Sequence, residues 1–253
     1  MRYTFAVLFG LVMGSFGNVC IYRLPEKKSI IRPGSHCPKC KSKIAWYDNI
    51  PLLSFIFLGA RCRNCKEKIS FVYPAVELAV ALFAVACLYR FGWNLASLLN
   101  FIFCWALVVI IFIDLRHRII PNVITFPGVV IGLIGSATVL EHSFLDGLLG
   151  AFLGGFLFWF VGQIYFWVTK RVGLGGGDIK LMAVVGAFLG FQNMVLTLGL
   201  SSIMGALFGV YLIIIKRKSS QYALPFGPFI AAGAMIALFF GWEIIEMYQG
   251  LLQ

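Results

Sequence analysis

The chain of 253 residues is unusually apolar and basic. Hydrophobic residues make up 60% of it, charged residues only 12%, and its mean hydropathy is +0.92. This composition excludes an ordinary soluble domain and a disordered chain, and it indicates an all-α protein that crosses a membrane many times. The net charge of +11 requires no nucleic acid partner, because a basic cytoplasmic face beside anionic phospholipids accounts for it.

Apolar runs predict about eight transmembrane helices. The runs lie at 3–21, 71–88, 96–113, 119–140, 145–168, 179–191, 194–215 and 222–242. Most of them approach the ~20 residues that span ~30 Å of hydrocarbon. The first run has no small-residue cleavage site after it, so we expect 1–22 to be a retained helix rather than a signal peptide. Pro225 and Pro228 are expected to kink the last helix near its cytoplasmic end.

The distribution of basic residues predicts the orientation of these helices. With the N-terminus outside, eleven of the 21 Lys and Arg residues fall in a cytoplasmic segment, 23–70, and eight more in later cytoplasmic connections. Only Arg2 and Arg90 then lie outside. Because short cytoplasmic loops carry an excess of Lys and Arg, this imbalance predicts an N-out/C-out topology.

The segment 23–70, between the first two predicted helices, carries four cysteines in two C-x2-C pairs. Twenty-one residues separate the pairs, Cys37 with Cys40 and Cys62 with Cys65. This spacing is typical of zinc ribbons, in which four thiolates hold Zn²⁺ tetrahedrally. A domain this small usually needs such a staple, and a cytoplasmic location argues against disulfides. We therefore expect a structural zinc site, with a redox or metal-free site as the alternative.

Two aspartates stand at the edges of apolar runs, where a charge is costly and usually functional. Asp114 ends the third predicted helix, and Asp178 opens the sixth. The predicted topology brings both to the cytoplasmic face from different helices, as an aspartyl protease pair requires. Taken singly, Asp114 could instead pair with Arg116 or Arg118, and Asp178 could be a helix N-cap.

The run Gly175, Gly176 and Gly177 directly precedes Asp178. Glycines lack a Cβ atom and accept positive φ, so a substrate backbone could approach this turn closely. We therefore predict that these three glycines contribute to substrate binding. A glycine-rich loop is weak evidence when it stands alone.

At this point the sequence resembles a known family, the type IV prepilin peptidases, also called prepilin leader peptidase/N-methyltransferases. The resemblance covers nearly the whole chain. It rests on GSFGNV at 14–19, YRLP at 22–25, both cysteine pairs, DNIP at 48–51, YPAVE at 73–77, the Asp114 segment, GGGD at 175–178 and PFGP at 225–228. Gly17 departs from the pattern, because the family usually has a larger apolar residue there.

The resemblance implies an enzyme with two activities in the bacterial inner membrane. Such enzymes cleave the basic leader of type IV prepilins and pseudopilins after a Gly on the cytoplasmic side, and then methylate the new N-terminus with S-adenosylmethionine. It implies that Asp114 and Asp178 are the proteolytic pair, in a G-x-G-D setting like that of presenilin-type proteases. Relatives without the cytoplasmic domain are peptidases only, so an intact 23–70 suggests the methylating form.

The resemblance and the topology together predict three parts: helix 1–22, a zinc-binding domain 23–70 associated with methylation, and a membrane peptidase domain 71–253. No Rossmann fingerprint marks a cofactor site. The candidates for the methylation site are the few acidic and amide residues of the cytoplasmic domain and its flanks: Glu26, Asp48, Asn49 and Glu77. Asp48 and Asn49 could alternatively form an ordinary turn before Pro51.

Two other classes of protein compete with the peptidase. One is a membrane transporter with the aspartates on an ion path, although both lie toward one face and no internal repeat is visible. The other is a non-catalytic assembly factor of pili or secretion systems, which predicts that both aspartates tolerate Asn.

Overall fold

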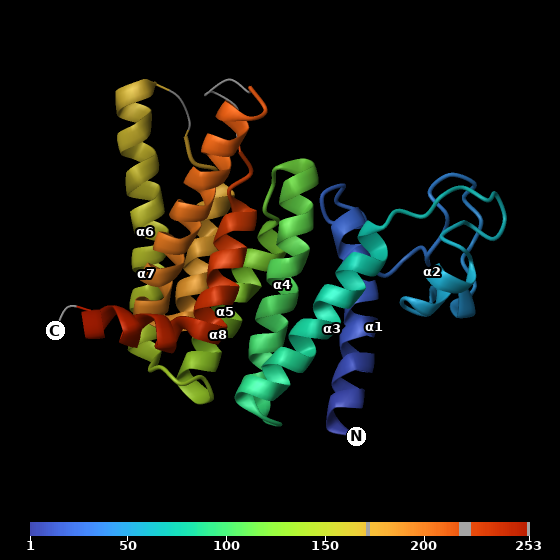
Figure 1. Cartoon of the computed structure of the whole chain (residues 1–253), viewed down its shortest axis with the longest axis horizontal. Coiled ribbons are helices and arrows are strands. Elements are labelled where there is room, and N and C mark those ends of the chain that lie inside the picture. The colour runs from blue at the N-terminus through green and yellow to red at the C-terminus, as the bar shows by residue number, and fades with distance from the viewer. Residues whose placement is uncertain (171–172, 218–223, 252–253) are drawn as a thin grey trace. The chain divides into compact units, whose positions relative to one another are not determined.

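The computed structural model describes residues 1–170, 173–217 and 224–251. The regular elements of these residues are helices, which Figure 1 shows coloured along the chain. They are α1 (Arg2–Arg23), η1 (Trp46–Asn49), α2 (Leu53–Phe57), α3 (Val72–Phe91), α4 (Leu95–His117), α5 (Asn122–Thr138), α6 (Phe144–Thr169), α7 (Gly176–Ile214) and α8 (Gly227–Leu251). The prediction of an all-α protein is confirmed.

Six of the described helices are long and apolar enough to cross a membrane, namely α1, α3, α4, α6, α7 and α8. The apolar helix α5 is shorter, with 17 residues. The small domain with the four cysteines lies between α1 and α3, as predicted. The N-out/C-out orientation stays a prediction, since it depends on the membrane itself.

Helix α7 reverses direction at Gly190, which has φ +73° and ψ 179°. A Cβ atom at Gly154 would lie 2.9 Å from the carbonyl oxygen of Met182 and 3.2 Å from Cγ of Met194. Twelve residues of straight helix would separate those two residues by ~18 Å. The runs predicted at 179–191 and 194–215 are therefore two helical segments, and each of the eight predicted runs overlaps a helical segment.

The chain divides into two compact units, Met1–Val109 and Ile110–Gln253. This division follows packing within the chain, whereas the predicted parts 1–22, 23–70 and 71–253 follow the expected membrane boundary. The three-part division stays a prediction.

In the first unit, α1 packs closely against α3 through glycines. Cβ atoms at Gly10 and Gly14 would each lie 2.6 Å from a Cα atom of α3, those of Ala81 and Glu77. Small residues four apart let helix backbones approach in a membrane. At Gly17, the atypical position, Nε1 of Trp105 lies 3.3 Å from where a Cβ would be, so the indole occupies the space of a larger side chain.

In the second unit, α6 and the first segment of α7 also meet through glycines. A Cβ at Gly150 would lie 2.6 Å from the carbonyl oxygen of Gly186. On the other side of α7, a Cβ at Gly132 of α5 would lie 2.9 Å from Cβ of Ala187. Backbone therefore rests directly on backbone around this segment, which fixes where its first turn lies.

The kink predicted at Pro225 and Pro228 is wrong. Helix α8 begins only at Gly227, so Pro225 precedes it and Pro228 stands in its first turn. Proline is accepted at the start of a helix, because the N–H that it lacks would have no partner within the helix. The two prolines therefore mark a helix start. Positions 222 and 223 of the predicted run lie outside the described residues.

Candidate active site and metal centre

Asp114 lies one turn before the end of α4, and its side chain is buried with only 5% of its surface exposed. Its Oδ2 atom accepts a hydrogen bond of 3.1 Å from the backbone N–H of Gly227. That N–H is available because Gly227 is the first residue of α8, where helix N–H groups have no partner within the helix. The start of one helix therefore holds the carboxylate at the end of another.

Gly227 is a candidate site residue that sequence reasoning did not assign. A Cβ at this position would lie 2.7 Å from Oδ2 of Asp114, closer than any side chain could approach without displacing the carboxylate. The signal was present in the PFGP run at 225–228, which the sequence analysis used as a family motif and as the site of a predicted kink, without a role for its glycine. Its glycine gives Asp114 room, and its prolines start the helix that donates to Asp114.

Asp178 is the third residue of α7 and is also buried, with 9% of its surface exposed. Its Oδ2 accepts a hydrogen bond of 3.2 Å from the N–H of Gly175, whose carbonyl accepts one of 3.1 Å from the Asp178 N–H. Asp178 thus closes the first turn of α7 from within, while Gly175 is the N-cap. The alternative that Asp178 itself is the N-cap is wrong by three residues.

The two carboxylates belong to one cluster in the second unit. They lie close enough to interact electrostatically. Ile120 packs between their helices, because its side chain lies 2.9 Å from a Cβ built on Gly177 and 3.2 Å from one built on Gly227. The last turns of α4 and the first turns of α7 and α8 lie at the same end of this unit in Figure 1.

The three glycines before Asp178 differ in their surroundings. Gly177 leaves room for Ile120, and Gly175 sits against the Asp178 carboxylate. A Cβ at Gly176 would meet nothing within 4 Å. The structure therefore gives packing reasons for two of the glycines and open space beside the third.

A polar contact joins α5 to α7 next to Asp178. The Lys180 ammonium donates a hydrogen bond of 2.8 Å to Oδ1 of Asn122, and it lies 5.4 Å from the ring centre of Phe126. The contact connects the first turns of the two helices. It places a positive charge two residues from Asp178.

The four predicted metal ligands converge in the first unit. The Sγ atoms of Cys37, Cys40, Cys62 and Cys65 all lie within 4.8 Å of one another. Those of Cys37 and Cys65 are 3.8 Å apart, and four Zn–S bonds of ~2.3 Å in a tetrahedron give an S···S separation of about 3.8 Å. The residues therefore fit a tetrahedral metal ion such as Zn²⁺.

The metal ligands sit on two similar knuckles, 37–44 and 62–69. In each, the first cysteine donates its N–H five residues ahead, Cys37 to Ser42 and Cys62 to Glu67. The hydroxyl and backbone of Ser42 lower the pKa of the Cys40 thiol to about 6, which favours the thiolate that metals require. An ion pair of 2.7 Å between Lys39 and Glu67 joins the knuckles directly.

Glu77, one of the residues predicted for methylation, is engaged by the protein itself. It is buried on α3, and its Oε2 accepts a hydrogen bond of 2.9 Å from the backbone N–H of Leu52. Leu52 has φ +58° and ψ −48°, a conformation that non-glycine residues rarely adopt. The carboxylate therefore fastens a strained turn of the four-cysteine domain, residues 23–70, to a membrane helix.

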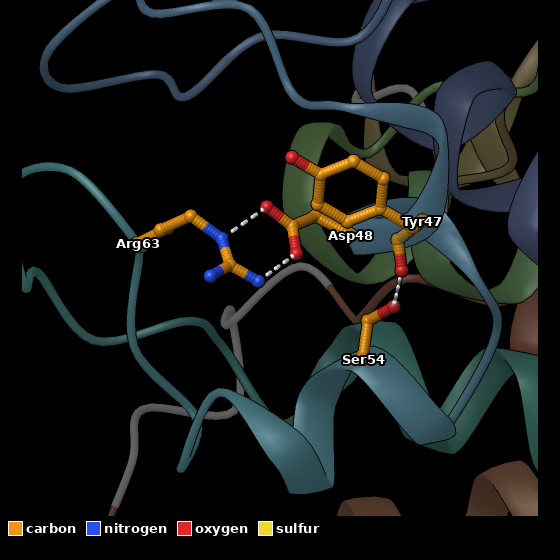
Figure 2. Close-up of polar contacts among 4 residues, drawn as sticks. All are labelled: Tyr47, Asp48, Ser54 and Arg63. Atoms are coloured by element: carbon orange, nitrogen blue, oxygen red, sulfur yellow. Dashed lines mark hydrogen bonds and ion pairs between the residues drawn. The ribbon is translucent and has the colours of Figure 1, made fainter.

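The other three residues predicted for methylation belong to the same domain. Figure 2 shows the Asp48 carboxylate facing the Arg63 guanidinium, with hydrogen bonds of 2.7 and 2.6 Å. These bonds lower the pKa of Asp48. Glu26 pairs with Lys28, and Asn49 is exposed at the end of η1. The structure thus distributes these residues over separate contacts.

Two family models match the chain. The Bacterial Peptidase A24 N-terminal domain matches residues 8–91, and the Type IV leader peptidase family matches residues 101–210. A prepilin leader peptidase/N-methyltransferase of Pseudomonas putida is 35% identical, over 98% of this chain and 94% of the relative. The protein of the same name from Pseudomonas aeruginosa is 36% identical, over 96% and 91%. The chain belongs to the type IV leader peptidase family.

Membership confirms the predicted class of enzyme, a leader peptidase of the kind that is also an N-methyltransferase, and with it a multi-pass protein of the bacterial inner membrane. The transporter and assembly-factor alternatives are set aside. A further relative of this name, from Myxococcus xanthus, is 41% identical over 85% of this chain and 64% of its own length. No solved structure matches the chain significantly.

Proposed function

We propose that this family member cleaves the basic leader of type IV prepilins and pseudopilins, with Asp114 and Asp178 as its catalytic pair. The single observation that carries this assignment is the meeting of two buried carboxylates from different helices. Peptide hydrolysis by two carboxyl groups needs one ionised and one protonated, and like charges held close favour that shared proton.

The proposed chemistry uses each carboxyl group once in the attack. The ionised carboxylate accepts a proton from a water molecule as the water oxygen bonds to the scissile carbonyl carbon. The protonated group donates its proton to the carbonyl oxygen, and a proton then passes to the amine as the C–N bond breaks. Hydrogen bonds from Gly227 and Gly175 hold the two carboxylates in place, whichever of them is the base.

The proposed location suits a substrate that is itself a membrane helix. A prepilin has a short basic leader in the cytosol followed by an apolar helix, so its scissile bond lies at the cytoplasmic boundary. The open space at Gly176 supports a binding role for Gly175, Gly176 and Gly177, where an unwound substrate backbone could lie. Basic leaders would approach anionic phospholipids rather than the enzyme's own basic residues.

The second proposed activity is methylation of the new N-terminus by the four-cysteine domain. Cys37, Cys40, Cys62 and Cys65 would hold a structural Zn²⁺, which stabilises a domain too small for a large core. S-adenosylmethionine would supply the methyl group. Glu26, Asp48, Asn49 and Glu77 remain the proposed methylation set, in which Glu77 and Asp48 act by holding the domain in shape and Asn49 is exposed.

The deciding experiment is mass spectrometry of a prepilin co-expressed with the wild type, with Asp114→Asn, with Asp178→Asn and with a variant lacking the four cysteines. The wild type should yield a product shortened to the residue after Gly and heavier by one methyl group. Both Asp variants should leave the leader in place, and the cysteine variant should give an unmethylated product. Unchanged cleavage in both Asp variants would discard the catalytic pair.

A further inference from the structure

The four-cysteine domain carries an exposed apolar face that neither candidate site uses. We define this face by Trp46, Ile50, Leu53, Ile56 and Phe57, on η1, α2 and the turn between them. Trp46, Ile56 and Phe57 are 81%, 70% and 83% exposed. Clustered apolar side chains at this exposure mark an interaction surface, since soluble domains rarely leave such groups in water.

Polar contacts fix the elements that bear the apolar face. The Ser54 hydroxyl on α2 donates a hydrogen bond of 3.0 Å to the carbonyl oxygen of Tyr47 on η1, as Figure 2 shows. Asp48 of η1 is held by Arg63 of the second knuckle. Asp48 and Ser54 therefore bond within the domain, while the side chains of the apolar face remain exposed. The folded domain therefore already holds the elements that carry the apolar face.

The apolar face is also tied to a membrane helix. The bond from the Leu52 N–H to Glu77 fixes the residue before α2 to a point five residues inside α3, which corresponds to ~7.5 Å along that helix. The ring of Phe55 packs against Phe71, just before α3, with centroids 5.3 Å apart. Because α3 is a candidate span, these contacts keep the start of α2 beside the end of the helix at which that span begins.

Charge complementarity identifies the partner. Residues 23–70 contain eleven Lys and Arg residues against three acidic ones, Glu26, Asp48 and Glu67. Basic segments beside a membrane span are attracted to anionic lipids, and tryptophan favours the interface between headgroups and acyl chains. An apolar face with basic surroundings, tied to the start of a span, has the combination of features that interfacial elements use.

We propose that the apolar face inserts into the anionic cytoplasmic leaflet and is a third membrane attachment of the four-cysteine domain, besides α1 and α3. The partner is a lipid surface that contains phosphatidylglycerol or similar anionic lipids. The attachment holds the metal knuckles at the membrane surface. The proposal depends on α1 and α3 being membrane spans and is independent of the catalytic assignment.

The test uses the full-length protein in nanodiscs, with one fluorescent probe on the face. Trp46→Phe provides the background, and Phe57→Trp is added to it, so that a difference spectrum reports residue 57 alone. Lipids brominated near the top of their acyl chains should quench this probe at least about twofold, because interfacial side chains reach ~5–10 Å into the boundary region. The quenching should weaken when phosphatidylglycerol is replaced by phosphatidylcholine.

The matched control is Asn64→Trp in the same background, because Asn64 is exposed on the second knuckle and is not part of the apolar face. Its fluorescence should respond to aqueous acrylamide and not to brominated lipid. Ile56→Trp gives a second probe on the face, and the bound zinc content of each variant verifies that the domain is folded. Acrylamide quenching of the face probes as strong as that of Asn64→Trp, or lipid quenching that ignores phosphatidylglycerol, would overturn the proposal.

Discussion

The two functional regions of this protein are held in shape by opposite means. Around Asp114 and Asp178, backbone N–H groups of Gly227 and Gly175 hold the carboxylates, and glycines leave the space that this requires. In the four-cysteine domain, side chains form the links: four thiols, the pair Lys39 with Glu67, and the pair Arg63 with Asp48. The membrane site thus depends on side chains being absent, and the domain on particular ones being present.

The largest effect should come from the catalytic pair itself. Asp114→Asn and Asp178→Asn should each lower the cleavage rate by at least about 10³-fold, because general acid–base groups contribute ~10²–10⁴-fold and each is needed. Initial rates on a purified prepilin in detergent measure this. Both variants should keep the wild-type zinc content, because the proposed zinc ligands belong to the four-cysteine domain. A loss of zinc in either variant would contradict the independence of the two regions.

Replacing one metal ligand tests how the four-cysteine domain is held in shape. Residues that only support a metal ligand change metal affinity by ~10–100-fold, so Cys62→Ser should lower zinc affinity by more than about 100-fold. Methyl transfer should be lost while cleavage stays within a few-fold of wild type. Zinc analysis and product mass measure the two effects on one sample. Equal loss of both activities would contradict the proposed separation.

Adding a single carbon atom should damage the membrane site. Gly227→Ala places a Cβ where the Asp114 carboxylate lies, and a displacement of ~1 Å in a catalytic group can cost about 10²-fold in rate. Gly199→Ala is the matched control, because a Cβ there meets nothing within 4 Å. Its cleavage rate should match wild type. Equal activity of both variants would show that Asp114 does not need the space.

A smaller effect is expected where the domain joins α3. Glu77→Ala removes the acceptor of the Leu52 N–H, a hydrogen bond to a carboxylate of the kind worth ~1.5–3 kcal/mol. Methyl transfer should fall about tenfold, since ~1.4 kcal/mol corresponds to a factor of ten. Cleavage should be unchanged. Glu77→Gln retains an acceptor oxygen and should recover most of the methylation; failure to recover would point to a role for the charge itself.

The smallest effect should follow the loss of the contact between α5 and α7. Lys180→Met removes the hydrogen bond to Asn122, and such a bond is worth about 1 kcal/mol. A several-fold drop in cleavage is expected, with unchanged methylation of a pre-cleaved peptide. The effect on cleavage should be small because the backbone contacts of α7 with Gly150 and Gly132 remain. A loss of cleavage rate as large as that of Gly227→Ala would contradict the expected order of the effects.

Features carried by local patterns could be predicted from the sequence. Apolar runs located the long helices, since they report which residues avoid water, but not the short η1 and α2. The cysteine spacing predicted the four-cysteine cluster, because two such pairs can supply all four ligands of one metal ion. The pairing of Asp114 with Asp178 followed from counting membrane crossings. Each of these inferences needs only one stretch of chain or an ordered series of stretches.

Contacts between distant segments could not be predicted in this way. The bond between Asp114 and Gly227 joins residues 113 positions apart, and that between Glu77 and Leu52 joins a helix to an irregular loop. In both bonds the donor is a single backbone N–H group, so no local pattern of side chains indicates the contact. The glycine in PFGP and the acid in YPAVE were visible, but their roles depend on distant partners, Asp114 and Leu52.

The contact between Gly150 and Gly186 limits how far the first segment of α7 can tilt. Backbone lies against backbone there, and again where Gly154 meets the carbonyl oxygen of Met182. Asp178 lies eight residues away, about 12 Å along the helix, so a tilt of about 5° would swing its carboxylate by about 1 Å. A displacement of that size can lower a reaction rate about 10²-fold, so the glycine contacts that hold this segment also protect the position of Asp178.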